Sequence, residues 1–116
     1  MFLDDFRNHC LQKPGVSEGF PFDKRTLVFK VYGKMFALTD VDEFDAINLK
    51  CDPEKALDLR ERFQAIQPGY HMNKKHWNTV LLRDDVSDQM LLNLVDDSYL
   101  LVYDSLPKKV KHENPL

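Results

Sequence analysis

The chain is organised around the stretch Pro68-Gly69-Tyr70-His71-Met72-Asn73-Lys74-Lys75-His76-Trp77-Asn78-Thr79-Val80. This stretch holds the only tryptophan, two of the four histidines and two adjacent lysines, and it contains no acidic residue. Pro68-Gly69 interrupts regular secondary structure, and Asn73-Lys74-Lys75 is typical of a polar turn. Residues 77–82, in contrast, are rich in side chains that favour strands. The pattern predicts a hairpin-like excursion over residues 66–82 with a basic tip, and it predicts that Trp77 lies in the core.

The segments on either side of this stretch carry strong element signals. Residues 46–51 alternate apolar and polar side chains, which predicts a strand. Asp52-Pro53-Glu54 then supplies an N-cap acid, a proline at the first helical position and an acid in the first turn, so a helix begins there. Beyond the polar connector Arg83-Asp84-Asp85, Ser87 caps the last predicted helix, which ends before Pro107.

Residues 26–39 form the clearest hairpin in the sequence. Two β-rich runs flank Tyr32-Gly33, and a two-residue loop at this pair would set Val31 opposite Lys34. The same register predicts one apolar face made by cross-strand pairs of Phe29 with Phe36 and Leu27 with Leu38.

A helix over about residues 2–12 and an edge strand over 16–22 precede this hairpin. The predicted order is therefore α-β-β-β-β-α-β-β-α, with three helices. Runs of strands joined by short turns favour an α+β fold, in which an antiparallel sheet carries helices on one side or end. A chain of 116 residues buries one core, so we expect one domain over residues 1–107 and a flexible tail over 108–116.

Charge is unevenly distributed in this chain of net charge −3. Residues 67–83 carry three basic side chains and no acidic ones, and residues 84–104 carry six aspartates and no basic side chain. The bulk charge argues against unselective nucleic-acid binding, but a clustered basic face is sufficient for a binding footprint. No apolar run reaches the ~18–20 residues that span a membrane, and the start lacks a secretory pattern, so we expect a cytoplasmic protein. Cys10 and Cys51 are too few for a disulfide framework, and we expect buried free thiols.

Several motifs, taken in order, resemble those of the MmcQ/YjbR family of small bacterial proteins. They are Lys13-Pro14-Gly15-Val16, Val28-Phe29-Lys30-Val31, Gly33-Lys34-Met35-Phe36-Ala37-Leu38, Ile47-Asn48-Leu49-Lys50-Cys51-Asp52-Pro53-Glu54, the opening stretch, and Leu94-Val95-Asp96-Asp97-Ser98-Tyr99. The resemblance covers nearly the whole chain and stops before Lys108. It implies an α+β fold around an antiparallel sheet, similar to the "double wing" domain of the phage transcription factor MotA. It thereby implies a DNA-binding protein, although a fold does not fix function. It supplies no catalytic residues.

The leading functional hypothesis from the sequence is DNA binding through the basic tip. Lys74 and Lys75 would neutralise phosphates, and Asn73 would bond phosphates or base edges. Two lysines at a turn are also ordinary solvated turn chemistry, which is the alternative explanation. The candidate nucleic-acid-binding residues are His71, Asn73, Lys74, Lys75 and His76, with Lys30 and Lys50 in support if their strand faces lie beside the tip.

Two other classes of function remain open from the sequence. A protein–protein adaptor is the alternative, with the acidic last helix steering a partner and exposed Tyr99 and Tyr103 as anchors. An enzyme is not expected, since the chain lacks a G-x-S-x-G elbow and a phosphate-binding glycine loop. His71 and His76 are five residues apart, which does not match helical zinc ligands at i and i+4. We therefore expect no metal and no cofactor, although tertiary contacts could still assemble a site. A monomer is favoured.

Overall fold

The computed structural model describes residues 1–83 and 85–116, so the middle residue of the predicted 83–85 connector lies outside the described residues. Within these residues, six strands form one antiparallel sheet in the order β1-β2-β3-β4-β6-β5. The strands are β1 (Val16–Gly19), β2 (Thr26–Val31), β3 (Lys34–Asp40), β4 (Ala46–Lys50), β5 (Ile66–Pro68) and β6 (Trp77–Leu81). The helices are α1 (Leu3–Leu11), α2 (Pro53–Arg62), α3 (Asp88–Asp104) and α4 (Lys108–Glu113). The α+β class and the order of the first nine elements are confirmed, but α4 makes the helix count four rather than three.

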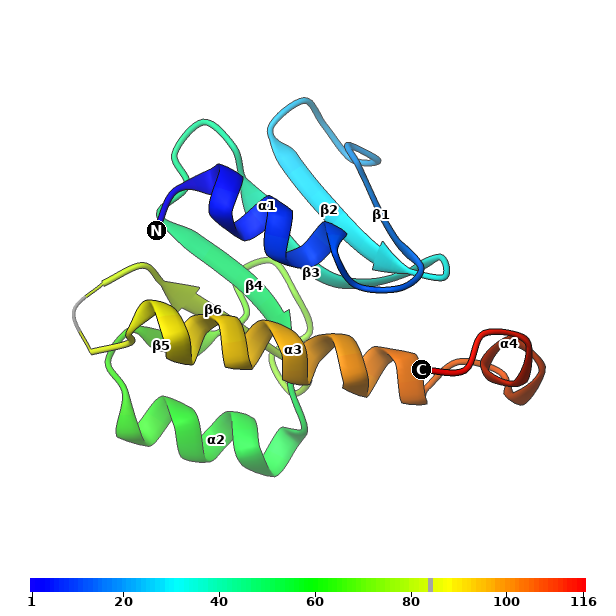
Figure 1. Ribbon diagram of the computed structural model, residues 1–116. Helices are drawn as coiled ribbons and strands as arrows, with labels where there is room; N and C mark the ends of the chain where they lie inside the picture. The colour runs from blue at the N-terminus through cyan, green and yellow to red at the C-terminus, as the bar shows by residue number, and fades with distance from the viewer. Residues whose placement is uncertain (84) are drawn as a thin grey trace.

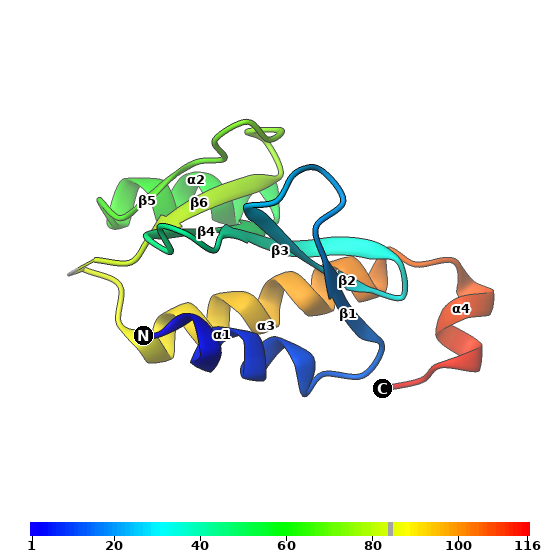
Figure 2. The ribbon, with the colours of Figure 1, turned by 90° about the horizontal axis from the view of Figure 1, so that it is seen from above.

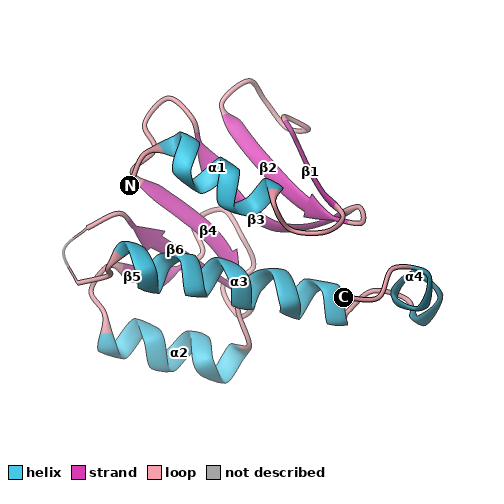
Figure 3. Cartoon of the chain, in the orientation of Figure 1, coloured by secondary structure: helices cyan, strands magenta, loops and turns pink. Residues whose placement is uncertain are grey.

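The helices are distributed unequally over the sheet. Figures 1 and 2 show α1 and α3 on one face of the sheet, where they contact each other as well as the strands. Helix α2 lies beside the end of the sheet formed by β5 and β6 (Figure 1). On the face turned away from α1 and α3, which we call the open face, the loops before β2 and before β6 rise above the strands (Figure 2). Figure 3 looks from the opposite side and shows the helices α1 and α3, in cyan, lying in front of the magenta strands.

The core lies between the sheet and the two helices on its covered face. Phe6 of α1 packs edge-on against Phe29 of β2 with ring centroids 5.3 Å apart, and Phe36 of β3 meets Tyr99 of α3 in the same way at 5.5 Å. Burying a side chain of this size contributes about 1.5–3 kcal/mol relative to leaving it exposed. A buried hydroxyl, that of Ser98 on α3, donates to the Phe36 carbonyl and accepts from the Lys50 amide at 2.9 Å. The Ser98 hydroxyl is therefore fully used to fix α3 across two strands.

The β2–β3 hairpin has the predicted loop but a different register further along. Val31 pairs with Lys34, and Tyr32 and Gly33 both have positive φ, +45° and +89°, as a two-residue type I′ turn requires. A bulge next to Lys30 then shifts the pairing, so that Phe29 lies opposite Ala37 and Leu27 opposite Thr39. The predicted Phe29–Phe36 and Leu27–Leu38 pairs are wrong for this reason. One extra residue in β3 lets Phe36 and Ala37 both enter the core and turns Leu38 to the open face.

The helix caps follow the sequence signals. The Asp52 carboxylate accepts from the Lys55 amide at 3.4 Å, and Ser87 Oγ accepts from the Met90 amide at 3.1 Å. No helix in the described residues has the length and apolar character needed to cross a membrane.

Helix α4 occupies the segment that we expected to be a tail. The Tyr103 hydroxyl donates to the Asn114 carbonyl at 2.6 Å, Lys111 Nζ donates to the Asp104 carbonyl at 3.1 Å, and Val110 packs against the core. These contacts come from α3, so local sequence signals could not reveal them. The mobility of the tail stays a prediction.

Both cysteines are free thiols, as expected, but only one is fully buried. Cys10 lies in the core, and burial raises the pKa of its thiol to about 12. Cys51 is half-buried at the end of β4, where burial again raises the thiol pKa. Neither thiol is a ready nucleophile at neutral pH, because the thiolate is the reactive form.

Candidate functional site

The basic tip predicted from the sequence is an ordered loop over residues 69–76, between β5 and β6. The Gly69 amide donates to the Trp77 carbonyl and the Tyr70 amide donates to Thr79 Oγ1, both at 2.9 Å. At the other side of the loop, Lys74 Nζ donates to the Gly69 carbonyl at 2.9 Å. The loop therefore closes on itself and on β6, which fixes the direction in which its remaining side chains point.

Asn73 forms the turn inside this loop. Its Oδ1 accepts from the amides of Lys75 at 2.9 Å and His76 at 3.3 Å, and its carbonyl accepts from the Trp77 amide at 2.9 Å. This is the ordinary turn role of asparagine. The side-chain oxygen is thus occupied within the protein, and only the Nδ2 donors of Asn73 remain available to a partner.

Arg60 on α2 braces the loop from outside, a role that the sequence did not reveal. Its Nε donates to Asn78 Oδ1 at 2.7 Å, and its terminal nitrogen contacts the carbonyls of Trp77, at 3.2 Å, and Lys74. A guanidinium presents several donors in one rigid plane, which suits this three-acceptor arrangement. Residues 60 and 74–78 are far apart in sequence, so no local signal could have identified the brace.

The outward surface of the loop is aromatic and basic. Tyr70 is 69% exposed and its ring lies 4.0 Å, centroid to centroid, from that of His71. His71 adopts a left-handed conformation with φ +58°, which is uncommon for a residue other than glycine. Lys74 and Lys75 are exposed, and no carboxylate among the described residues pairs with either of them. The loop thus keeps its positive charge available to solvent or to a ligand.

A groove of about 510 Å³ runs along the open face beside this loop. Phe22, 64% exposed, lines one side, and Tyr70 and His71 line the other, over a floor that includes Leu38 and Asn48. The floor is tied to the loop, because Thr79 Oγ1 bonds to Asn48 Oδ1 and accepts from the Tyr70 amide. The lining residues are Phe22, Asp23, Thr26, Met35, Leu38, Thr39, Asp40, Asn48, Tyr70, His71 and Met72. Exposed aromatic side chains on both sides make this groove suited to a flat ring system.

The acidic side chains of the groove are engaged within the protein. Hydrogen bonds from the amides of Thr26 and Arg25, at 2.6 and 2.8 Å, lower the pKa of Asp23. Asp40 accepts from the Arg25 guanidinium at 2.8 Å. Negative charge therefore lies near the Phe22 side of the groove and positive charge near the 69–76 loop.

The supporting lysines of the sequence prediction lie in two different places. Lys30 is on β2 between residues of the covered face, so its side chain belongs to the open face, beside a small hollow formed with residues 17–21. It is three strand spacings, roughly 14 Å, from β6. Lys50 instead lines a pocket between α2 and α3. The structure thus brings together His71, Asn73, Lys74, Lys75 and His76, sets Lys30 on the same face, and separates Lys50 from them.

The anchors expected for a protein adaptor are not available. Tyr99 and Tyr103, predicted to be exposed, are only 3% and 7% exposed, because α3 turns both rings into the core. Two acidic side chains near the middle of α3 are also occupied. Asp96 contacts His9 at 2.6 Å and Lys13, whereas Asp97 pairs with Lys55 at 2.9 Å. Within the described residues, no three His, Cys, Asp or Glu side chains come close enough together to hold a metal ion.

Comparisons with known proteins agree with the motifs quoted above. The YjbR family model matches residues 11–101. YbdF of Escherichia coli O157:H7 is 42% identical over 101 residues, which cover 86% of this chain and 83% of that protein. YjbR of Escherichia coli K12 is 33% identical over 110 residues, covering 94% and 93% of the two chains. Both relatives are described only as uncharacterized proteins.

Two solved structures share the fold. A Deinococcus radiodurans protein with a DUF419 domain matches with a TM-score of 0.90 and 44% identity, covering 97% of this chain and 86% of that one. A Pseudomonas syringae protein matches with a TM-score of 0.72 and 30% identity, covering 87% and 98%. With the family model spanning most of the sequence and full-length relatives at this level of identity, the chain belongs to the YjbR family.

Proposed function

We propose that this protein binds DNA through the 69–76 loop and the adjoining groove of the open face, without a chemical step. The observation that carries the proposal is that one braced loop presents Tyr70, His71, Lys74 and Lys75 to solvent, with no acidic partner for its lysines among the described residues. The resemblance of the family's fold to the double-wing domain of MotA also supports DNA as the partner. A DNA partner fits the cytoplasmic location expected from the sequence.

The charge distribution suggests how a strand would lie. Phosphates would follow the 73–76 end, where positive charge is free, and would avoid the Asp23 and Asp40 side of the groove. A base would enter the groove between Phe22 and the Tyr70–His71 pair. Stacking of bases on aromatic side chains, together with a basic track for the backbone, is the usual arrangement in proteins that bind single strands. Lys30 would extend the basic surface along the open face, and Lys50 would contribute least because it lines another pocket.

The test is a salt titration of DNA binding by fluorescence anisotropy, with single-stranded DNA in one arm and duplex DNA in the other. Between about 50 and 200 mM salt, the logarithm of the binding constant should fall linearly with the logarithm of salt concentration. The double variant Lys74→Ala/Lys75→Ala should reduce the size of that slope by about 1.4 on a single strand or about 1.8 on duplex, since two phosphate contacts are lost.

The matched control is Lys108→Ala/Lys109→Ala, which removes two exposed charges from α4, outside the proposed site. It should leave the slope unchanged. Lys75→Ala alone is a second check, because it spares the bond from Lys74 Nζ to the Gly69 carbonyl. Absence of saturable binding at 50 mM salt, or equal losses in the two double variants, would rule out this site.

A further inference from the structure

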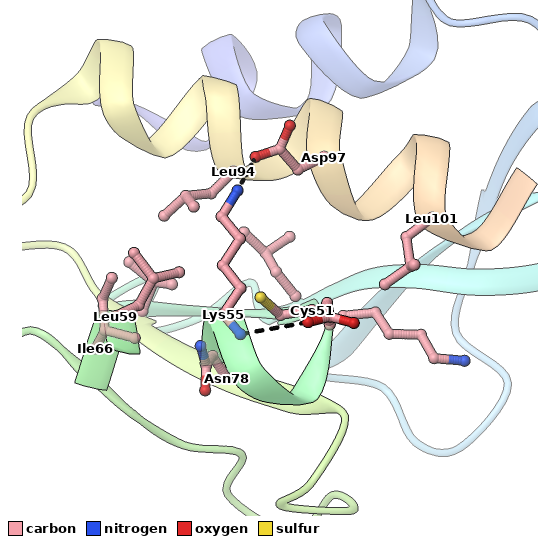
Figure 4. Close-up of a pocket in the computed structure, with 12 residues that line it drawn as sticks. Cys51, Lys55, Leu59, Ile66, Asn78, Leu94, Asp97 and Leu101 are labelled. Carbon is pink, nitrogen blue, oxygen red and sulfur yellow. Dashed lines mark hydrogen bonds and ion pairs between the residues drawn. The ribbon is translucent and has the colours of Figure 1, made fainter. Parts of the chain in front are cut away.

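A second pocket, which we call the helix pocket, lies on the other side of β6 from the open-face groove. Its volume is about 180 Å³, and it is bounded by α2, α3 and the ends of β4 and β6 (Figure 4). Most of its wall is apolar, supplied by Leu49, Leu59, Ile66, Val80, Leu94 and Leu101. An engineered protein cavity of about 150 Å³ with a comparable lining is large enough for benzene. The helix pocket can therefore hold one small ring with a short substituent.

One buried side chain, that of Asn78, directs its amide nitrogen into this apolar space, where none of the described residues accepts a hydrogen bond from it. Asn78 is 3% exposed, and its Oδ1 accepts from Arg60 Nε at 2.7 Å. An arginine side chain has only donors, so the amide oxygen must face Arg60 and the Nδ2 group must face away from it. Figure 4 shows the Asn78 nitrogen directed to the side of Lys55 and Cys51. The described residues offer Nδ2 no acceptor, and none of their fully buried polar atoms is left unpaired, so this nitrogen opens on the pocket.

The charges around the pocket balance one another. Lys55 of α2 and Asp97 of α3 form an ion pair at 2.9 Å across it, and Lys50 and Asp52 add one charge of each sign. The hydrogen bond from Lys55 to Asp97 raises the pKa of the lysine, and burial raises the pKa of the Cys51 thiol, so the pair stays charged and the thiol stays neutral at neutral pH. The four charged side chains that line the pocket therefore sum to zero net charge. The site therefore favours a neutral ligand.

We propose that the helix pocket is a binding site for a small neutral molecule with an apolar ring or branched chain and one carbonyl oxygen, which accepts a hydrogen bond from Asn78 Nδ2. The ligand would contain roughly nine non-hydrogen atoms, given the comparison with benzene. A ligand of this size that fills an apolar pocket binds with a dissociation constant of about 0.1–1 mM. This site is separate from the proposed DNA surface, and Arg60 touches both.

Three probes of equal size test the chemistry: acetophenone with a carbonyl, cumene with a methyl group in place of that oxygen, and benzoate with a charge. Binding is followed by NMR of the ¹⁵N-labelled protein. Acetophenone should give saturable shifts at Cys51, Leu94 and the side-chain amide of Asn78, and should bind about fivefold more tightly than cumene because one hydrogen bond is added. Failure of all three probes to bind would overturn the proposal. Benzoate binding as tightly as acetophenone would overturn the preference for a neutral ligand.

Two kinds of variant locate the site. Asn78→Leu should remove the preference for acetophenone over cumene while both still bind, whereas a preserved preference would exclude Asn78 as the donor. Asn78→Leu also removes the oxygen that accepts from Arg60. A pair of tryptophan variants therefore provides a test that leaves the Arg60–Asn78 bond in place. Leu101→Trp should fill the pocket and weaken both probes at least tenfold, and Leu100→Trp, an exposed neighbour on the same helix outside the lining, should leave them unchanged. Equal effects of the two tryptophans would place the probes elsewhere.

Discussion

Replacing Arg60 by methionine removes the guanidinium that braces the 69–76 loop but retains an unbranched, largely apolar stem. Three acceptors lose a donor, namely the carbonyls of Lys74 and Trp77 and the side-chain oxygen of Asn78, but the Trp77 carbonyl keeps its bond from the Gly69 amide. The Lys74 carbonyl is exposed and regains water, so its bond contributes little to stability. The bond to Asn78 is partly buried and has a charged donor, so it contributes about 1.5–3 kcal/mol, whereas the partly buried Trp77 carbonyl loses less because it keeps the Gly69 amide. We expect Arg60→Met to lower the free energy of unfolding by about 2–3 kcal/mol, or Tm by roughly 8–12 °C.

Urea unfolding followed by the fluorescence of Trp77, the only tryptophan, measures this loss directly. Hydrogen exchange at the amides of residues 74–77 should also accelerate, because the loop would open more often. Arg62→Met is the matched control on the same helix. Its exposed ion pair with Asp58 at 3.3 Å contributes at most about 0.5 kcal/mol. If Arg60→Met costs no more stability than Arg62→Met, the Arg60 guanidinium does not brace the loop.

Three further predictions concern the loop, the groove and the contact between α1 and α3. Gly69→Ala would bring a new Cβ within 2.8 Å of Trp77 Cβ and should cost about 1–3 kcal/mol in urea unfolding, whereas Gly19→Ala, with open space around it, should not suffer this clash. Tyr70→Ala should weaken single-stranded DNA binding by about 5- to 150-fold through lost stacking, measured by anisotropy, and Phe2→Ala, exposed on another part of the molecule, should not. Asp96→Asn should lower stability by about 1 kcal/mol at neutral pH, because Asp96 contacts His9 and Lys13 and is partly screened by solvent. Burial works to raise the pKa of Asp96, but hydrogen bonds from Lys13 and His9 lower it overall. The difference in stability between the wild type and Asp96→Asn should therefore persist above the ordinary aspartate pKa and disappear as pH falls through the lowered pKa of Asp96. A stability difference that does not depend on pH would contradict this.

Much of the fold could be predicted because its signals are local. Alternating side chains marked β4, Asp52-Pro53-Glu54 marked the start of α2, and Ser87 marked the cap of α3. The β2–β3 turn could also be predicted, from Tyr32 and Gly33 alone. The register beyond the bulge did not, because the extra residue in β3 reflects packing of both Phe36 and Ala37 against the helices rather than any turn signal.

The candidate site, too, could be predicted only in part from the sequence. The 69–76 loop was identifiable as basic, aromatic and rich in amide side chains, and Asn73 has the turn role that its position indicates. The groove was not predictable, since Phe22 and Tyr70 come from loops that lie close together only once the sheet has formed. The expected exposure of Tyr99 and Tyr103 failed because α3 buries a wider stripe than its most apolar positions suggested.

By itself, the sequence determined the α+β class, the order of nine elements, the family and the composition of the basic loop, all of which depend on neighbouring residues or on motifs in order. Only the tertiary structure decided which side chains meet across long separations. It joined Arg60 to Asn78 and to the loop, placed Lys30 on the open face and Lys50 in the helix pocket, and held α4 against Tyr103. The physical reason is that these contacts depend on strand register and helix rotation, which are set by packing of the whole core.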